Sequence, residues 1–127
     1  ISLNLKNTPD LAQTIAVTCL GMHIQCNLTG LHTLKIKETD RLIALKIEIE
    51  KLGAKVNITD TSFELINSSQ INRNISIDTY NDHRMAMAFA PLGLKVPITI
   101  NNAGVVSKSY PNFWDDLIRI DFDQKIF

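Results

Sequence analysis

Apolar residues recur at helical spacing in four stretches of the chain, and each stretch has a helix-starting residue near its amino end. The first start is Thr8-Pro9-Asp10. Threonine can cap a helix, proline suits its first turn, and an acid favours the positive end of the helix dipole. An apolar stripe marks the second helix, which Gly53 ends: Leu42, Leu45, Ile49 and Leu52. We expect helices over about residues 8–20, 39–53, 81–94 and 109–118.

Short alternating stretches between these helices predict strands. They are Ile24 to Leu28, Val56 to Ile58, Phe63 to Leu65, Ile75 to Ile77 and Ile98 to Ile100. The second and third of these strands are expected to form a hairpin around residues 59–62, and "SSQINRN" (68–74) reads as a loop.

Two of the helices differ from ordinary surface helices in having almost no polar face. Residues 85–94 are apolar all round except at Pro91, which is expected to kink or end the helix, and residues 11–20 are nearly so. The strands alternate, so one face of each sheet should meet water. The pattern therefore predicts an α/β (α+β) fold in which buried helices lie inside outer sheets, with inside-out repeats of strand–helix units.

The order of elements repeats. The interval from Asp10 to Lys37 is 27 positions and that from Asp82 to Lys108 is 26, and each holds a helix, a strand and a loop that ends in lysine. We interpret residues of about 1–74 as one unit with a hairpin and about 75–127 as a second unit. The chain starts without methionine at Ile1, and we expect it to be part of a longer protein.

Composition excludes several classes of function. The 127 residues are 45% hydrophobic and 20% charged, and 13 basic residues balance 13 acidic ones. Zero net charge argues against a nucleic-acid partner or an acidic membrane. No apolar run reaches the roughly 18 residues that a spanning helix needs. Cys19 and Cys26 are read as reduced, buried thiols of a cytoplasmic protein, and no Cys or His pair has the spacing of a metal site.

Charged side chains of candidate chemical importance gather at the helix starts: Asp10, Lys37, Glu38, Arg41, Asp82, His83, Arg84 and Lys108. Free N–H groups and the helix dipole make such ends attractive to anions, and lysine and arginine strengthen that attraction. Carboxylates in such a site are natural proton carriers for acid–base chemistry.

Simpler interpretations stay open for each position. Asp10 could be an ordinary acid of the first helical turn, and Lys37, Glu38 and Arg41 could be solvated charges at the start of a helix. His83 could be a capping or core residue, and Lys108 could be an ordinary loop lysine. Four further charges of the second helix are interpreted as its solvated face: Lys46, Glu48, Glu50 and Lys51.

Four segments in order resemble the 5-enolpyruvylshikimate-3-phosphate synthase family. They are "TPDLAQTIAV", "KIKETDRLIALKIEIEKLG", "YNDHRMAMAFAPLGL" and "VSKSYPNFWDDL". The resemblance implies a partial C-terminal domain with buried helices and outer sheets, as in enolpyruvyl transferase domains. It also implies transfer of the enolpyruvyl group of phosphoenolpyruvate to the 5-hydroxyl of shikimate 3-phosphate, without metal or cofactor, and glyphosate as an inhibitor.

The same resemblance assigns roles to residues. Asp10 and Lys37 would touch the reacting hydroxyl, with Asp10 as the base, and Glu38 would handle the proton at the phosphoenolpyruvate methylene carbon. Phosphoenolpyruvate would be held by Arg41, Arg84 and Lys108, with His83 beside them. Thr33 and Lys35 replace the Asn and Arg that family members often carry, and Thr33 would take the shikimate side.

Length limits what this chain should do by itself. Full family members are several times longer, so we expect the isolated chain to be inactive without the remaining part of the enzyme. Two rivals stay open. One is the sister family that acts on UDP-N-acetylglucosamine, which lacks the Lys-Glu-Thr-Asp-Arg signature. The other is a non-catalytic anion-binding or assembly domain that keeps the fold.

Overall fold

The computed structural model describes residues 1–66 and 70–125. Within these ranges the strands are β1 (Ser2–Asn4), β2 (Cys26–Thr29), β3 (Val56–Ile58), β4 (Phe63–Leu65), β5 (Ile75–Ile77) and β6 (Ile98–Ile100). The α-helices of the same ranges are α1 (Ala12–Gly21), α2 (Arg41–Lys51), α3 (His83–Phe89) and α4 (Phe113–Arg119). Short 3-10 helices cover Pro9–Leu11, His32–Ile36, Ala90–Leu94 and Ala103–Val106.

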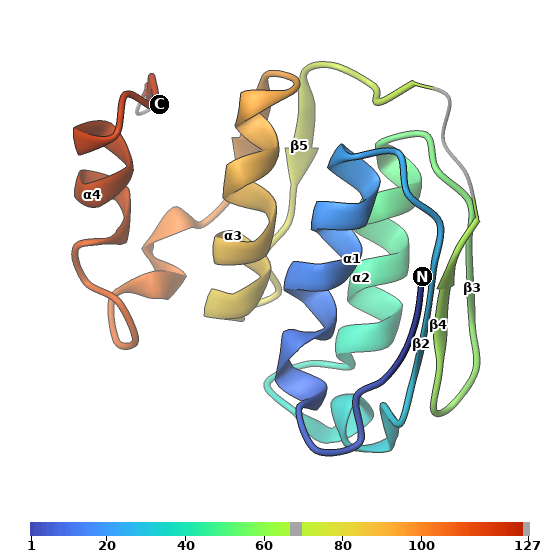
Figure 1. The fold of residues 1–127 in the computed structure, drawn as a ribbon. Coiled ribbons are helices and arrows are strands. Elements are labelled where there is room, and N and C mark those ends of the chain that lie inside the picture. The colour runs from blue at the N-terminus through green and yellow to red at the C-terminus, as the bar shows by residue number, and fades with distance from the viewer. Residues whose placement is uncertain (67–69, 126–127) are drawn as a thin grey trace.

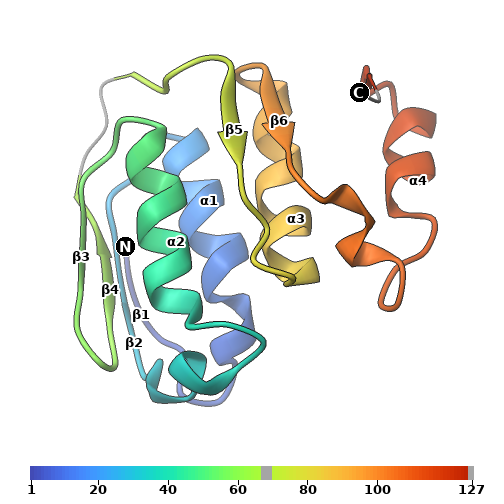
Figure 2. The same ribbon diagram turned by 180° about the vertical axis from the view of Figure 1, so that it is seen from behind.

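α1, α2 and α3 lie on the inner sides of the sheets, and α4 lies apart from both sheets at the edge of the molecule (Figures 1 and 2). Among the described residues one sheet has four strands in the order β1-β2-β4-β3 and the other pairs β5 with β6. The larger sheet flanks α1 and α2, and the smaller one covers α3. The predicted α/β architecture with inner helices and outer sheets is confirmed.

Both sheets contain a parallel strand pair that is joined through a helix. β1 and β2 pair in parallel through α1, and β5 and β6 pair in parallel through α3. A parallel pair needs such a crossover connection, whereas the antiparallel hairpin β3–β4 needs only a short turn. The helix–strand–helix order predicted twice from the sequence occurs as α1–β2–α2 and α3–β6–α4.

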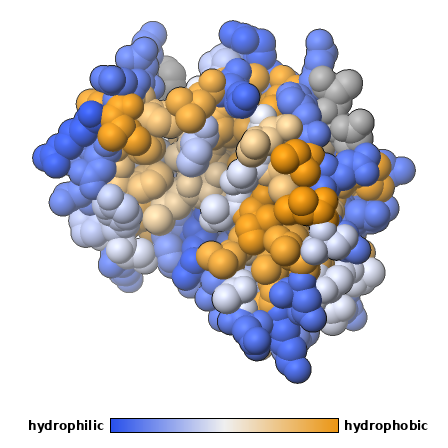
Figure 3. Space-filling view, in the orientation of Figure 1, coloured by the Kyte–Doolittle hydropathy of each residue, from blue (hydrophilic) through white to orange (hydrophobic). Residues whose placement is uncertain are grey.

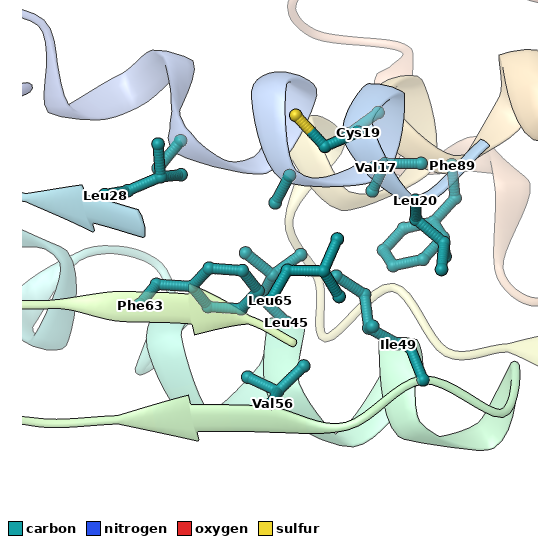
Figure 4. Packing of buried hydrophobic residues seen from close by; sticks show 14 of the residues in the cluster. Val17, Cys19, Leu20, Leu28, Leu45, Ile49, Val56, Phe63, Leu65 and Phe89 are labelled. Carbon is teal, nitrogen blue, oxygen red and sulfur yellow. The ribbon is translucent and has the colours of Figure 1, made fainter. Parts of the chain in front are cut away.

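The core forms where the sheet faces the helices. Side chains from the sheet and from α1 and α2 meet in one layer, Phe63, Leu45 and Leu20 among them (Figure 4). Ala12 and Ala16 are fully buried, and such small residues let α1 pack closely against α3. The predicted stripe of α2, from Leu42 to Leu52, is buried at all four positions.

Element boundaries differ from prediction where local geometry intervenes. Thr8 makes no capping hydrogen bond, and residues 9–11 form a 3-10 turn before α1. α2 begins at Arg41, two residues later than expected, because the Asp40 side chain accepts the amide hydrogen of Ile43 and caps it. α4 begins at Phe113 rather than near Ser109.

Pro91 acts as expected. α3 ends at Phe89 and continues as the 3-10 helix Ala90–Leu94, because proline has no N–H for the α-helical bond. The expectation that residues 85–94 are buried on every side is wrong at the end of the segment, where Leu94 is 73% exposed. β1 was not expected, and the predicted loop 68–74 lies partly outside the described residues, at positions 68 and 69.

Apolar side chains gather over α1 and α3 on the face seen in Figure 3. Among the residues of α1 and α3 and those next to them in the sequence, Leu11, Met22 and Leu94 are exposed, at 48%, 60% and 73%. Contiguous exposed apolar surface is typical of a region that another protein segment covers. This agrees with the expectation that the chain is part of a longer protein.

Cys19 and Cys26 are free and buried, as predicted, and burial and then the neighbouring Cys19 thiol raise the pKa of Cys26 to about 12. Across the part of the chain that is described, no helix has the length and apolarity to cross a membrane.

Gly30 is fixed by a close approach of two backbones. It follows β2 with φ at +74°, and an added Cβ would lie 2.6 Å from the Lys6 backbone nitrogen. Both the left-handed conformation and the contact exclude a side chain. We predict that Gly30→Ala lowers the free energy of unfolding by at least about 2 kcal/mol, measured by urea denaturation of the 127-residue chain.

Gly104→Ala is the matched control. Its added Cβ would meet nothing within 4 Å, so we expect a change within about 0.5 kcal/mol. Equal effects of the two substitutions would contradict the steric argument.

Candidate active site

The amino ends of α1, α2 and α3 lie at the same end of the molecule, the lower end in Figure 1. The 3-10 turns Pro9–Leu11 and His32–Ile36, which precede α1 and α2, contact each other there. Each helix start presents unpaired N–H groups and a partial positive charge. The charged residues predicted from the sequence therefore come from distant segments to one region.

Arg41 lies at the centre of this region. Its side chain is 2% exposed, and Nε donates to Asp82 Oδ2 at 2.7 Å. Nη1 donates to Asp10 Oδ1 at 3.0 Å, and Nη2 donates to Glu38 Oε2 and to Asp82 Oδ1. A buried guanidinium is stable when carboxylates neutralise it and accept its hydrogen bonds. Arg41 thus links the starts of α1, α2 and α3.

Two further cations flank Asp10 at the surface. Lys37 Nζ lies 3.8 Å from Asp10 Oδ1, and Arg84 Nη2 lies 3.8 Å from Asp10 Oδ2. Arg84 Nη1 also donates to the Asp10 carbonyl at 3.4 Å. These contacts are long and the two side chains are 36% and 40% exposed, so both cations can turn toward a bound anion at little cost.

Asp82 anchors the start of α3 and is fully buried. Its Oδ1 accepts the Arg84 amide hydrogen at 2.9 Å, which caps the helix, while Oδ2 accepts from Arg41. Gln13 of α1 is 1% exposed and donates Nε2 to Asp82 Oδ2 at 3.3 Å. Within residues 1–66 and 70–125 the Gln13 Oε1 atom has no hydrogen-bond partner.

We call the following residues the ionic cluster: Asp10, Lys37, Glu38, Arg41, Asp82 and Arg84. Its formal charges cancel. Attraction for an anion therefore depends on the helix ends and on cations that turn away from Asp10, because the cluster has no net positive charge. The carboxylates Asp10 and Glu38 are about 40% exposed and accessible as proton carriers.

Other predicted site residues are not joined to the cluster by a direct polar contact. Lys108 is exposed between Ala103–Val106 and α4, in a loop at the same end of the molecule, and it makes no ion pair with the cluster in the described structure. His83 is the half-buried first residue of α3. Thr33 has a buried hydroxyl that finds no hydrogen-bond partner among the described residues. Their assigned roles stay predictions.

Sequence reasoning missed two participants. Asp82 was noticed as a helix-start residue but not as the carboxylate that holds Arg41, and its position before His83 was the available signal. Gln13 gave no signal beyond being a polar residue in an apolar helix. The described residues contain no group of three His, Cys, Asp or Glu side chains arranged for a metal ion.

Arg41 should matter more to stability than Arg84. We predict that Arg41→Met lowers the free energy of unfolding by about 3–5 kcal/mol, because buried Asp82 loses its charged partner. The same substitution at Arg84, which is 40% exposed, should cost less than about 1 kcal/mol. Urea denaturation of both variants measures the difference, and similar losses would refute a central role for Arg41.

Comparison with known proteins places this site in a family. The sequence model of EPSP synthase (3-phosphoshikimate 1-carboxyvinyltransferase) matches residues 1–117. A 3-phosphoshikimate 1-carboxyvinyltransferase of Bacteroides fragilis is 47% identical over 121 residues, which cover 93% of this chain and 30% of that protein. The enzyme of the same name from Laribacter hongkongensis is 37% identical over 115 residues, 91% of this chain and 27% of its own length.

A solved structure agrees with the sequence matches. The EPSP synthase of Acinetobacter baumannii superposes with a TM-score of 0.77 at 26% identity, over 87% of this chain and 27% of that one. The chain thus spans about 30% of the length of the curated relatives that it matches. The family model, the relatives and the shared fold together show that the chain belongs to the EPSP synthase (3-phosphoshikimate 1-carboxyvinyltransferase) family.

Proposed function

We propose that this chain supplies part of the active site of an enzyme that transfers the enolpyruvyl group of phosphoenolpyruvate to the 5-hydroxyl of shikimate 3-phosphate and releases phosphate. The observation that carries the proposal is the ionic cluster, in which Arg41 unites Asp10, Glu38 and Asp82 from separate helix starts. Membership of the EPSP synthase family supports it.

Proton transfers fall to the accessible carboxylates. Asp10 takes the proton of the attacking hydroxyl, with Lys37 beside it, while the hydroxyl oxygen bonds to C2 of phosphoenolpyruvate and Glu38 delivers a proton to the methylene carbon, which gives a tetrahedral intermediate. In the elimination that follows, Glu38 takes a proton back from the new methyl group, the bond between C2 and the phosphate oxygen breaks, and phosphate leaves with the proton that Asp10 held, which restores the double bond. Lys37 and Asp10 are 3.8 Å apart, so a hydroxyl between them can contact both. Thr33 contacts shikimate 3-phosphate.

Anion binding requires the cluster to open. Arg84 turns from Asp10 toward the carboxylate or phosphate of phosphoenolpyruvate, joined by Lys108 from its loop, with His83 at the same helix end. Arg41 supports this site by holding the carboxylates, and it reaches the ligand when Glu38 moves. The reaction uses no metal or cofactor, and glyphosate is a candidate inhibitor.

The whole enzyme is larger than this chain. In our proposal residues 1–127 form part of its C-terminal domain, with units at about 1–74 and 75–127, and the remaining part completes the shikimate 3-phosphate site in the cytoplasm. Because the formal charges of the cluster cancel, the chain alone should bind phosphoenolpyruvate poorly. The rest of the enzyme must add the cations that hold a second anionic substrate.

We predict that the isolated 127-residue chain releases no phosphate from phosphoenolpyruvate and shikimate 3-phosphate. A chimera in which the chain replaces the matching 30% of the Bacteroides fragilis relative should release it. A coupled phosphate assay measures both. Turnover by the chain alone would refute the need for the rest of the enzyme. An inactive, folded chimera would refute the proposed function and favour a non-catalytic domain.

In that chimera, Glu38→Gln should lower kcat by about 10²–10⁴-fold, because the amide cannot deliver the proton. Glu64→Gln is the control, since Glu64 is exposed on β4 between the buried Phe63 and Leu65. A Glu38→Gln chimera with kcat close to that of the parent would contradict the assigned role.

A further inference from the structure

Glu48 was expected on the solvated face of α2, and that expectation is wrong. Its side chain is completely buried. Oε1 accepts hydrogen bonds from Lys51 Nζ at 2.7 Å and from the Asp78 backbone amide at 2.8 Å, and Oε2 accepts from the Tyr80 hydroxyl at 2.7 Å. A buried carboxylate with both oxygens satisfied marks a position that the fold specifies closely.

Two of the partners of Glu48, the Asp78 amide and the Tyr80 hydroxyl, belong to the turn between β5 and α3, residues 78–82. This turn is strained. Tyr80 and Asn81 have φ of 53° and 55°, consecutive left-handed conformations that cost free energy in residues other than glycine. Such a conformation persists only where surrounding contacts hold it.

Further contacts hold the same turn from the side of β6. The Thr79 hydroxyl donates to the Asn101 carbonyl at 2.9 Å, and Asn101 Nδ2 donates to Asp78 Oδ1 at 2.8 Å. The Asn101 and Lys51 donors lower the pKa of Asp78, which keeps it ionised. Burial and the Glu48 carboxylate raise the pKa of Tyr80, so its hydroxyl remains a donor.

Side chains of α2 therefore bind both ends of the turn formed by residues 78–82. Arg41 binds Asp82 at the end of the turn, and Glu48 binds Asp78 and Tyr80 nearer its beginning. Arg41 and Glu48 are seven residues apart, two turns of one helix, so they lie on the same face. Directly after this turn come His83 and Arg84, the first residues of α3.

We propose that Glu48 and Tyr80 are positioning residues for the active site. Their hydrogen bond fixes the strained turn, and the turn fixes the direction in which the first residues of α3, Arg84 above all, meet phosphoenolpyruvate. This inference rests on the proposed function. Neither Glu48 nor Tyr80 belongs to the ionic cluster, and both act through the turn.

The test uses Glu48→Gln and Tyr80→Phe in the chimera described above. Each should raise KM for phosphoenolpyruvate about tenfold or more and leave KM for shikimate 3-phosphate unchanged, because a small displacement of Arg84 weakens one ligand. The double variant should be no worse than the worse single variant, because both substitutions act on the same hydrogen bond: phenylalanine lacks the hydroxyl that donates it, and glutamine lacks the charge that strengthens it.

Glu50→Gln is the matched control. Glu50 lies on the same helix, and its side chain is 38% exposed and paired with Lys46 at 3.2 Å. It should leave both KM values unchanged. Tyr80→Phe removes a single hydroxyl, so it decides the test if Glu48→Gln fails to fold.

Failures of the two proposals are distinguishable. An active parent chimera whose variants keep KM for phosphoenolpyruvate, or raise both KM values together, would overturn the positioning role alone. A fall in kcat with both KM values unchanged would do the same, because it reports general loss of stability. A folded parent chimera without turnover would overturn the proposed function and the positioning role with it.

Discussion

A positive charge held inside the protein is the constraint on which the site depends. Moving a guanidinium out of water costs several kcal/mol, and Arg41 offsets that cost through carboxylates that accept its hydrogen bonds. In the ligand-free chain Asp10, Glu38 and Asp82 therefore stay together around Arg41. The requirement of one buried cation thus brings helix starts from distant parts of the sequence to one place.

α2 connects this requirement to the core. One face of the helix carries the apolar stripe that packs beneath β4, and another carries Arg41 and Glu48 toward the turn before α3. Because the same rigid helix serves both faces, packing of the core sets the geometry of the site. Apolar residues are exposed over α1 and α3 in Figure 3, and the chain covers about 30% of the length of its relatives.

The sequence predicted most elements because their signals are local. Alternation identified β3 and β4 to the residue, and Pro91 correctly predicted the end of α3. β1 was not predicted from the sequence, because a three-residue strand with every residue exposed has no periodic signal and because its pairing with β2 is a long-range contact. At the site, the motifs identified Asp10, Glu38 and Arg41, and the structure showed that they contact one another.

The sequence by itself determined the element types, the order of the repeat and the chemical groups at the helix starts. Each of these depends on residues a few positions apart. Only the tertiary structure decided that Glu48 is buried, that Gln13 donates a hydrogen bond to Asp82 and that Asp82 holds Arg41. The hydrogen-bond partners that decide this lie 30 to 69 residues away in the sequence. From the sequence alone, a polar side chain that water will solvate cannot be told from one that a distant donor or acceptor will satisfy.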